Sequence, residues 1–417
     1  MHSDSPGVCA SDIATAAKRL RAGNRIVPDA SRAADALSRA IGLWRDKHYA
    51  RRRDAVAQIA RQAEYSVALL DASLDALLKP FSHAALNSLA AQMSRIERSD
   101  RPRVLGFIMP GNVAGAGLHE IAIGLVAGAG MIVKTASTEP VFFDAFARTI
   151  AELDREVASR IVVFNWGRDR VDLTAAISAN CDRIVAYGDE ATIESFRNMH
   201  PLIGFGSRVS RAVVAPGALV PERIDAVAES LARDVALFEQ LGCLSPHQVL
   251  VVNRSRDTAR EFASRMATAL DALALSMPPA RIPLSAAAEI RGIRERARWR
   301  RISGEPIELF EGPRLEWTVV FEPQSEEPFK VSPGFRTVYV TGVRDEALMQ
   351  ESLAAASRSR LLEAIAVAGD DAETLRISAI LATLGISYIC APGEMQSPPL
   401  VWRHGGGAFL DMMVASR

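Results

Sequence analysis

Residues 103–117 read RVLGFIMPGNVAGAG, a short apolar run that ends at a proline and a glycine, just before the helical pattern of residues 115–127. An apolar run bounded by turn residues predicts a buried strand, here Val104–Met109. The same alternation of strand and helix continues beyond it, with the spacing of parallel strands joined by crossover helices. This stretch therefore predicts a doubly wound parallel α/β sheet, whose ligands bind at the carboxyl ends of its strands.

The predicted secondary structure divides the chain around this stretch into three regions. Residues 12–98 have mainly helical patterns, a first α/β set runs from 103 to 215, and a second set follows Pro216. Loops are predicted at 303–315 and 322–334, where proline, glycine and acidic residues gather. The predicted strands are Val104–Met109, Met131–Lys134, Ile161–Phe164, Arg183–Ala186 and Arg211–Ala215 in the first set, and Gln248–Val252, Glu316–Phe321, Thr337–Thr341, Ala364–Val367, Ile386–Ile389 and Phe409–Val414 after it. The predicted helices of the two sets cover 115–127, 140–156, 169–178, 190–199, 222–238, 255–274, 344–357 and 371–383.

The composition of the 417 residues is ordinary for a globular protein with two or three domains. Apolar residues make up 49% and charged residues 24%, and 49 basic side chains balance 49 acidic ones. The charge therefore gives no support for a nucleic-acid partner. The four cysteines lie far apart, without metal-ligand or disulfide spacing, so we expect no metal site and a reducing environment.

Neither a membrane span nor a secretory signal is expected. The longest apolar run, Ile121 to Val133, is too short to cross a bilayer, which takes about 20 residues. The first residues, MHSDSPGVCASDIATAAKRLRAG, lack the apolar core of a secretory signal. We therefore predict a cytoplasmic protein without an integral membrane segment.

Candidate ligand-binding residues lie at or just after the ends of three of the predicted strands. The amide of Asn112, after the first strand, could stabilise an oxyanion or could cap the next helix. Lys134 ends the second strand and could bind a ribose or phosphate, or could be a solvated lysine before a hydroxyl helix cap. Gly188 follows the fourth strand and either admits a ligand to the backbone or makes a tight turn. The glycines after the first strand do not form G-x-G-x-x-G, so the usual dinucleotide fingerprint is absent.

Cys243 stands in FEQLGCLSPH, residues 238–247, between a helical pattern and a predicted strand. A thiol whose backbone is fixed on both sides can attack a carbonyl with little reorganisation, as a nucleophile requires. The alternative is a small apolar core residue, which is a common role of free cysteine. His247 follows four residues later, but the intervening Pro246 argues against a shared helix face, so we expect a structural role for this histidine.

Taken in order, these motifs resemble those of the aldehyde dehydrogenase superfamily. Within it they are most similar to the acyl-CoA reductases typified by the fatty-acid reductase of bacterial luminescence. The resemblance begins at about residue 100, and several matches in one order are more specific than any single motif. The phrases that carry it are MPGNV (109–113), GSRVS (206–210), EQLGCLSP (239–246), SPGFRTV (332–338) and GEMQSPP (393–399).

The resemblance implies an aldehyde dehydrogenase-like fold with a Rossmann-type cofactor domain and an α/β catalytic domain. It implies that Cys243 is the nucleophile and that Asn112, with the Cys243 backbone N–H, forms the oxyanion hole. Lys134 would contact the adenosine ribose of the cofactor, with Ser137 and Gly188 along the same groove. The domains expected on this basis are a helical region packed on the cofactor domain (1–99), the NAD(P)-binding domain (100–216), the catalytic domain (217–395) and a C-terminal tail (396–417).

The activity implied by the resemblance is the reduction of an acyl thioester, acyl-CoA or acyl-protein, to an aldehyde. The implied cofactor is NADPH, with NADH as the alternative. The implied partner is an acyl-activating enzyme, and we expect a homo-oligomer.

One departure bears on this activity. Aldehyde-oxidising members carry a glutamate base in the phrase ELGGK, whereas the corresponding stretch here is GFGSR, residues 204–208, without a carboxylate. Reduction of a thioester does not need that base. The sequence leaves three alternatives open: a non-acylating aldehyde dehydrogenase, an acyl-phosphate reductase and a catalytically silent scaffold subunit.

Overall fold

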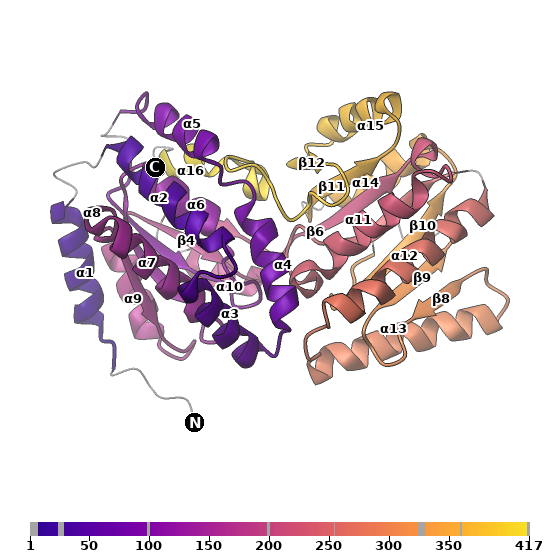
Figure 1. Cartoon of the computed structure of the whole chain (residues 1–417), viewed down its shortest axis with the longest axis horizontal. Helices are drawn as coiled ribbons and strands as arrows, with labels where there is room; N and C mark the ends of the chain where they lie inside the picture. The colour runs from indigo at the N-terminus through magenta and orange to yellow at the C-terminus, as the bar shows by residue number, and fades with distance from the viewer. Residues whose placement is uncertain are drawn as a thin grey trace. The chain divides into compact units, whose positions relative to one another are not determined.

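The computed structural model of the chain describes residues 7–23, 29–97, 101–197, 201–253, 255–323, 330–358 and 361–414. These residues form two compact units, each built around its own sheet (Figure 1). The first unit takes its described residues from Met1–Ala63, Leu77–Ser207 and Pro399–Arg417, and the second from Glu64–Ala76 and Arg208–Pro398. The end of the chain thus belongs to the same unit as most of its first half.

The first unit contains a five-stranded parallel sheet in the order β3-β2-β1-β4-β5. The chain starts at the central strand, adds β2 and β3 on one side, and then returns to add β4 and β5 on the other. Such a reversal creates a switch point beside the first strand, at the carboxyl edge where ligands bind in doubly wound sheets. The strands are β1 (Val104–Ile108), β2 (Gly130–Thr135), β3 (Ile161–Asn165), β4 (Arg183–Tyr187) and β5 (Leu202–Phe205).

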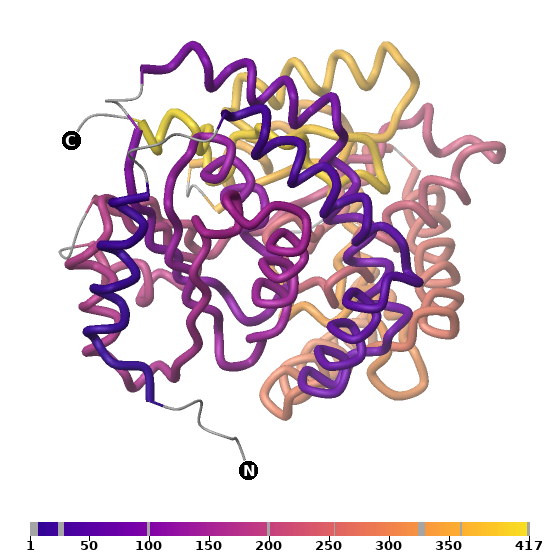
Figure 2. The backbone as a smooth tube through the Cα atoms, turned by 60° about the vertical axis from the view of Figure 1, so that its left-hand side comes forward, coloured from indigo at the N-terminus to yellow at the C-terminus, as the bar shows by residue number. Residues whose placement is uncertain are grey.

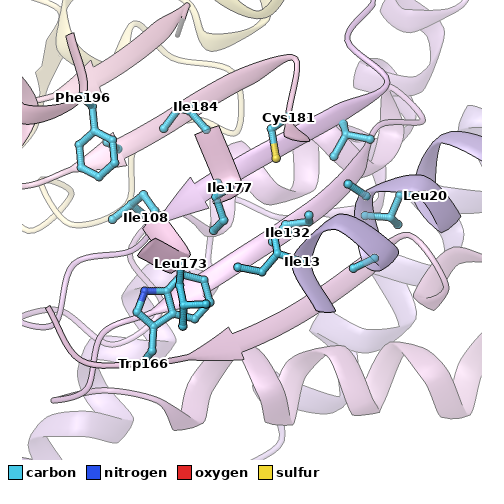
Figure 3. Packing of buried hydrophobic residues seen from close by; sticks show 14 of the residues in the cluster. Ile13, Leu20, Ile108, Ile132, Trp166, Leu173, Ile177, Cys181, Ile184 and Phe196 are labelled. Atoms are coloured by element: carbon cyan, nitrogen blue, oxygen red, sulfur yellow. The ribbon is translucent and has the colours of Figure 1, made fainter. Parts of the chain in front are cut away.

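Helices cover both faces of this sheet. On one face, α1, α9 and α10 bury a continuous apolar cluster, in which Ile13 and Leu20 of α1 pack with Ile132 and Cys181 (Figure 3). On the other face, α6 packs on Met131, whose side chain alternates with that of Ile132 across the strand. The helices of this unit are α1 (Ala10–Gly23), α2 (Ala30–Arg45), α3 (Ala50–Ala63), α5 (His83–Met93), α6 (Leu118–Val126), α7 (Val141–Leu153), α8 (Arg155–Ala158), α9 (Val171–Asn180), α10 (Glu190–Arg197) and α16 (Phe409–Val414). The helix α16, drawn in yellow near the C-terminus in Figure 2, contacts α6.

The second unit contains a seven-stranded sheet in the order β12-β11-β6-β7-β10-β9-β8. All neighbours are parallel except β8, which pairs with β9 in the antiparallel sense. The strands are β6 (Val209–Val214), β7 (Pro246–Val252), β8 (Glu308–Glu311), β9 (Thr318–Glu322), β10 (Thr337–Val343), β11 (Leu362–Ala368) and β12 (Tyr388–Cys390).

Two layers of helices enclose the seven-stranded sheet. On one side α14 (Glu346–Arg358) and α15 (Asp371–Thr383) bury an apolar cluster against the central strands. In the second layer, α11 (Ile224–Ala236) and α12 (Arg256–Ser276) pack side by side, and α13 (Leu284–Ile302) covers β8 and β9 (Figure 1). The helix α4 (Val67–Leu78) is divided between the two units.

The strand predicted at Arg211–Ala215 does not belong to the first sheet, contrary to the prediction. It is β6, paired with β7 and β11 in the second sheet, while the fifth strand of the first sheet is β5, which the sequence analysis missed. The two strands are separated by only three residues, 206–208, so spacing alone could not show that the chain changes sheets between them.

Two further predictions were wrong. Residues 303–315 are not all loop, because β8 forms an antiparallel edge there, and Phe409–Val414 forms the helix α16 rather than a strand. Its buried residues Phe409, Leu410 and Met413 have helical spacing. Residues 324–329 of the predicted loop 322–334 lie outside the described residues. Among the residues that are described, no helix is both long enough and apolar enough to span a bilayer.

Candidate active site

Cys243 lies in the loop that connects α11 to β7, at the amino end of that strand, and is half-buried. The sequence placed this cysteine between a helix and a strand, and the structure confirms that placement. Cys181, in contrast, is buried in the apolar cluster of the first sheet (Figure 3). Burial raises the pKa of the Cys181 thiol to about 12, so this cysteine has the packing role that was the alternative for Cys243.

The backbone before Cys243 has an unusual conformation. Phe238, Glu239 and Gln240 all have positive φ, at 54°, 53° and 61°. A residue with a side chain disfavours the left-handed region by about 1–2 kcal/mol, and such strain persists only where surrounding contacts enforce it. Positive φ recurs at Phe335 and Arg336, at 51° and 55°, just before β10. The loop is therefore held in place by tertiary contacts and not by local preference.

The two left-handed segments are joined directly. The Phe335 backbone N–H donates to the Glu239 carbonyl at 2.8 Å, and the Arg336 guanidinium donates to the Glu239 carboxylate at 2.8 Å. The side chains of this ion pair are at most 1% exposed. Burial raises the pKa of Glu239, and the charge of Arg336 opposes that rise. A paired, enclosed carboxylate holds the loop and is poorly placed to activate water.

Further buried contacts fasten the rest of the loop. The Gln240 side chain accepts a hydrogen bond from the Thr337 N–H and donates one to the Pro246 carbonyl, both at 2.8 Å. The Gln396 amide donates to the Ser245 hydroxyl at 3.0 Å. The Ser210 hydroxyl donates to the carbonyl of Cys243 itself at 2.7 Å. Four of the five quoted sequence phrases thus meet around the Cys243 loop.

His247 is also part of this framework. Its ring Nδ1 lies 3.1 Å from the backbone N–H of Ser332 and 3.0 Å from the Ser332 hydroxyl. Because the backbone N–H can only donate, Nδ1 must accept, and the ring proton is on Nε2. Burial lowers the pKa of His247 to about 4, an effect to which the nearby Arg211 adds. A neutral, engaged ring agrees with the structural role expected from the sequence.

In the first unit, Lys134 lies near the carboxyl end of β2, and Asn112 follows the adjacent strand β1. Lys134 pairs with Ile108 at the end of β1, and the Met109 N–H donates to the Lys134 carbonyl at 2.9 Å. Past the strand ends, the Thr138 hydroxyl donates to the Gly111 carbonyl at 3.2 Å. The loop of Asn112 is therefore tied to the loop that carries Ser137.

The structural alternatives for these residues do not hold. The residue before α6 is Gly117, and no side chain caps that helix, so Asn112 is not its cap. The first N–H groups of α7 bond to the carboxylate of Glu139 and not to a hydroxyl. Lys134 is 8% exposed, and burial together with the charge of Arg168 lowers its pKa. A mostly covered lysine at the carboxyl edge of a sheet is a group that a polar ligand could bind.

Gly188 follows β4 at the same edge, on the other side of β1. A Cβ at this position would lie 2.7 Å from the Thr192 side chain, so the glycine is needed for the tight turn into α10. The Asp189 carboxylate caps that helix by accepting from the Thr192 N–H at 2.8 Å. A cofactor phosphate would meet this carboxylate at the helix start, so the edge is better suited to ribose hydroxyls.

The first unit thus brings Asn112, Lys134, Ser137 and Gly188 to one sheet edge, at the switch point of its topology, while Cys243 belongs to the second unit. An ammonium and a hydroxyl are donors that fit the ribose of a nicotinamide cofactor, and an amide N–H is a donor that suits an oxyanion. Over the described ranges, His, Cys, Asp and Glu side chains form no group of three or more that could hold a metal ion. The sequence analysis missed Ser210, Arg336 and Gln396 as supports of the Cys243 loop, although all three stand in the quoted phrases.

Solved structures define the class to which this architecture belongs. An oxidoreductase from Marinobacter aquaeolei matches 99% of the chain with a TM-score of 0.72 and 14% sequence identity, over 90% of its own length. A NAD-dependent benzaldehyde dehydrogenase from Corynebacterium glutamicum matches 94% of the chain with a TM-score of 0.71 and 16% identity, over 88% of its length. The fold is therefore the aldehyde dehydrogenase fold, as the sequence predicted.

Sequence comparison identifies the family within this fold. The chain belongs to the acyl-CoA reductase (LuxC) family, whose model matches residues 28–416. It is similar to the long-chain acyl-protein thioester reductase of Aliivibrio fischeri, with 23% identity over 328 residues. That match covers 72% of this chain and 65% of the relative, just under two thirds of the relative's length.

Proposed function

We propose that this protein reduces an acyl thioester, acyl-CoA or acyl-protein, to an aldehyde through an acyl-cysteine formed at Cys243. The observation that carries the proposal is the Cys243 loop, whose strained backbone is fastened by buried side chains around a half-buried thiol. Fixing a nucleophile in this way removes reorganisation from the step in which it attacks. The family, and the thioester named for the Aliivibrio fischeri relative, support the choice of substrate.

In the proposed reaction the Cys243 thiolate attacks the thioester carbonyl and forms a new carbon–sulfur bond. The tetrahedral oxyanion accepts hydrogen bonds from the Asn112 amide and from the Cys243 backbone N–H. Collapse breaks the original thioester bond, and the CoA or protein thiol leaves with a proton from solvent. The acyl group then remains on Cys243 until it is reduced, and aldehyde release frees the cysteine.

A nicotinamide cofactor would supply the hydride for that reduction, and we propose NADPH over NADH. Lys134, Ser137 and Gly188 would hold it at the carboxyl edge of the five-stranded sheet. The ammonium of the buried Lys134 residue would bind ribose hydroxyls, and the exposed Ser137 would add a hydroxyl contact. The name of the Corynebacterium glutamicum neighbour, a NAD-dependent enzyme, supports the nicotinamide class.

Resistance of the acyl-cysteine to water is the second part of the proposal. Residues 204–208 contain no carboxylate. Glu239 is enclosed in its ion pair, and His247 is buried with Nδ1 engaged. A general base must reach the water that it activates. These side chains support reduction in preference to hydrolysis.

We further propose that the protein works in the cytoplasm as a homo-oligomer beside an acyl-activating enzyme. The spacing of the four cysteines supports a reducing compartment. The partner enzyme and the oligomer rest on the family resemblance.

The test is product analysis. The purified protein is given a panel of acyl-CoAs with NADPH, and aldehyde formation is followed with cofactor oxidation. In the reverse direction it is given aldehyde and NADP⁺, with and without CoA. We expect aldehyde from acyl-CoA, and acyl-CoA from aldehyde only when CoA is present. The Cys243→Ala variant should lose both activities.

Other products would point to the alternatives. Rapid release of free carboxylic acid without CoA would favour a non-acylating dehydrogenase, and turnover of an acyl phosphate but of no thioester would favour an acyl-phosphate reductase. Inactivity towards every acyl donor, with cofactor still bound, would favour a scaffold subunit.

A further inference from the structure

The Ser210 side chain connects the Cys243 loop to the middle of the seven-stranded sheet. Ser210 lies at the start of β6 and is fully buried. Its hydroxyl donates to the Cys243 carbonyl at 2.7 Å and accepts from the Ala364 backbone N–H at 3.0 Å. A serine hydroxyl has one proton to donate, and this one is given to the carbonyl of the candidate nucleophile.

The sheet is locally irregular around this hydroxyl. Opposite Ser210, β11 has an extra residue between Leu362 and Ile365, and β7 has an extra residue, His247. Such bulges open the hydrogen-bond ladder and redirect side chains, and they are common next to active sites. Here the bulge in β11 leaves the Ala364 N–H for the Ser210 hydroxyl. A regular ladder would pair that N–H with the neighbouring strand and not with a side chain.

We propose that Ser210 is a positioning residue for Cys243. By holding the Cys243 carbonyl, it fixes the peptide plane after the cysteine and limits rotation of the backbone that carries the thiol. The Glu239–Arg336 pair and the Gln240 side chain fasten the loop before and after Cys243, whereas Ser210 holds the cysteine itself. This inference rests on the proposed role of Cys243 as nucleophile.

Loss of the Ser210 hydroxyl should change the position of the Cys243 thiol relative to the thioester, and not only the stability of the protein. Removal of the hydroxyl by Ser210→Ala keeps the Cys243 thiol but removes the hydrogen bond that holds the Cys243 carbonyl. A small misplacement of a reacting group costs about 10- to 100-fold in rate, so we expect acylation of Cys243 to slow by that factor. Ser210→Thr keeps the donor and should acylate at a rate close to that of the unmodified protein.

The experiment measures two rates on the full chain without cofactor. The first is acylation of Cys243 by an acyl-CoA, followed by mass spectrometry of the cysteine peptides. The second is alkylation of Cys243 by iodoacetamide, compared within each sample with the exposed Cys9. Burial raises the pKa of Cys181 and of Cys390 to about 12, so these two thiols should react little. We expect Ser210→Ala to slow acylation at least 10-fold more than alkylation.

A matched control comes from the same sheet. The buried Thr341 hydroxyl of β10 accepts a hydrogen bond from the Gln248 side chain at 2.8 Å. Thr341→Val removes that bond at almost constant volume and should leave acylation unchanged. Equal slowing by Thr341→Val and Ser210→Ala, or equal slowing of both reactions, would reduce Ser210 to a structural residue and overturn the inference.

The experiment distinguishes a wrong role for Cys243 from a wrong role for Ser210. If the unmodified protein takes up no acyl group at Cys243, the proposed function falls and this inference falls with it. If the unmodified protein is acylated and Ser210→Ala is acylated equally fast, only the inference is wrong.

Discussion

The Cys243 loop and the carboxyl edge of the five-stranded sheet are built in opposite ways. The loop has three consecutive left-handed residues, enforced by a buried ion pair and by side-chain contacts from distant segments. The edge around Asn112 and Lys134 consists of parallel strands with continuous register and ordinary turns. The loop therefore depends on particular side chains far away in sequence, whereas the edge follows from the strand and helix pattern itself.

Because of this difference, substitutions in the loop should affect folding, whereas substitutions at the edge should affect only the chemistry. Removing a support of the strained loop leaves both an unpaired buried group and an unsupported backbone. Removing a polar side chain from the regular edge leaves the backbone as it was. The loop should therefore couple stability to activity, and the edge should separate them.

The largest expected loss of stability comes from Arg336→Met. The substitution leaves the buried Glu239 carboxylate without its partner, and breaking a buried pair costs about 3–5 kcal/mol in the free energy of unfolding. Urea unfolding measures this cost. The control is Arg376→Met, which breaks a half-exposed pair with Glu346 and should cost less than about 1 kcal/mol. Equal unfolding midpoints for the two variants would show that the strained loop does not depend on this pair.

Asn112→Ala should show the opposite behaviour at the regular edge. We expect kcat to fall by about 10²- to 10³-fold, because an oxyanion donor acts mainly in the transition state, with KM little changed. The thermal midpoint should stay constant, since Asn112 is exposed and does not cap α6. Asn112→Asp, of the same size without the amide donor, should be at least as slow. A lower midpoint with normal kcat would contradict the assignment.

A smaller effect, dependent on pH, is expected at His247. Its folded pKa of about 4 lies below the ordinary value of 6.5, so the unfolded chain binds a proton first as the pH falls. The contribution of neutral His247 to the free energy of unfolding is complete above about pH 6.5. It is lost as the pH falls through about 4, and the loss is on the order of 3 kcal/mol. His247→Gln, which keeps an acceptor for Ser332, should lack this part of the acid sensitivity. Parallel urea titrations at several pH values measure the difference, and identical acid profiles would refute it.

The sequence predicted the features that depend on local pattern. Strand and helix alternation predicted the doubly wound sheet, and the predicted strand ends placed Asn112 and Lys134 at its edge. The Gly-Cys phrase placed Cys243 between a helix and a strand. These predictions succeeded because hydrophobic period and turn residues act within a few positions.

The predictions of sheet order and of the loop supports failed where they depend on contacts that join distant segments. Nothing local distinguishes the last strand of one sheet from the first strand of the next, so β5 was missed and β6 was given to the wrong sheet. Phe238, Glu239 and Gln240 have left-handed backbone conformations although none of them is a glycine, so nothing in the sequence signals this conformation. The supports at Ser210 and Arg336 become visible only when the strands that carry them are paired. The motif phrases contained these residues, but sequence alone could not show which atoms they would hold.

The most direct test of the account is the mass of Cys243 after incubation with an acyl-CoA in the absence of NADPH. We predict one acyl group on the peptide that contains Cys243, released by hydroxylamine or by added NADPH and stable in buffer alone. The Cys243→Ala variant should take up none. An acyl group on another residue, or uptake by Cys243→Ala followed by aldehyde formation, would contradict the assignment of Cys243 as the nucleophile.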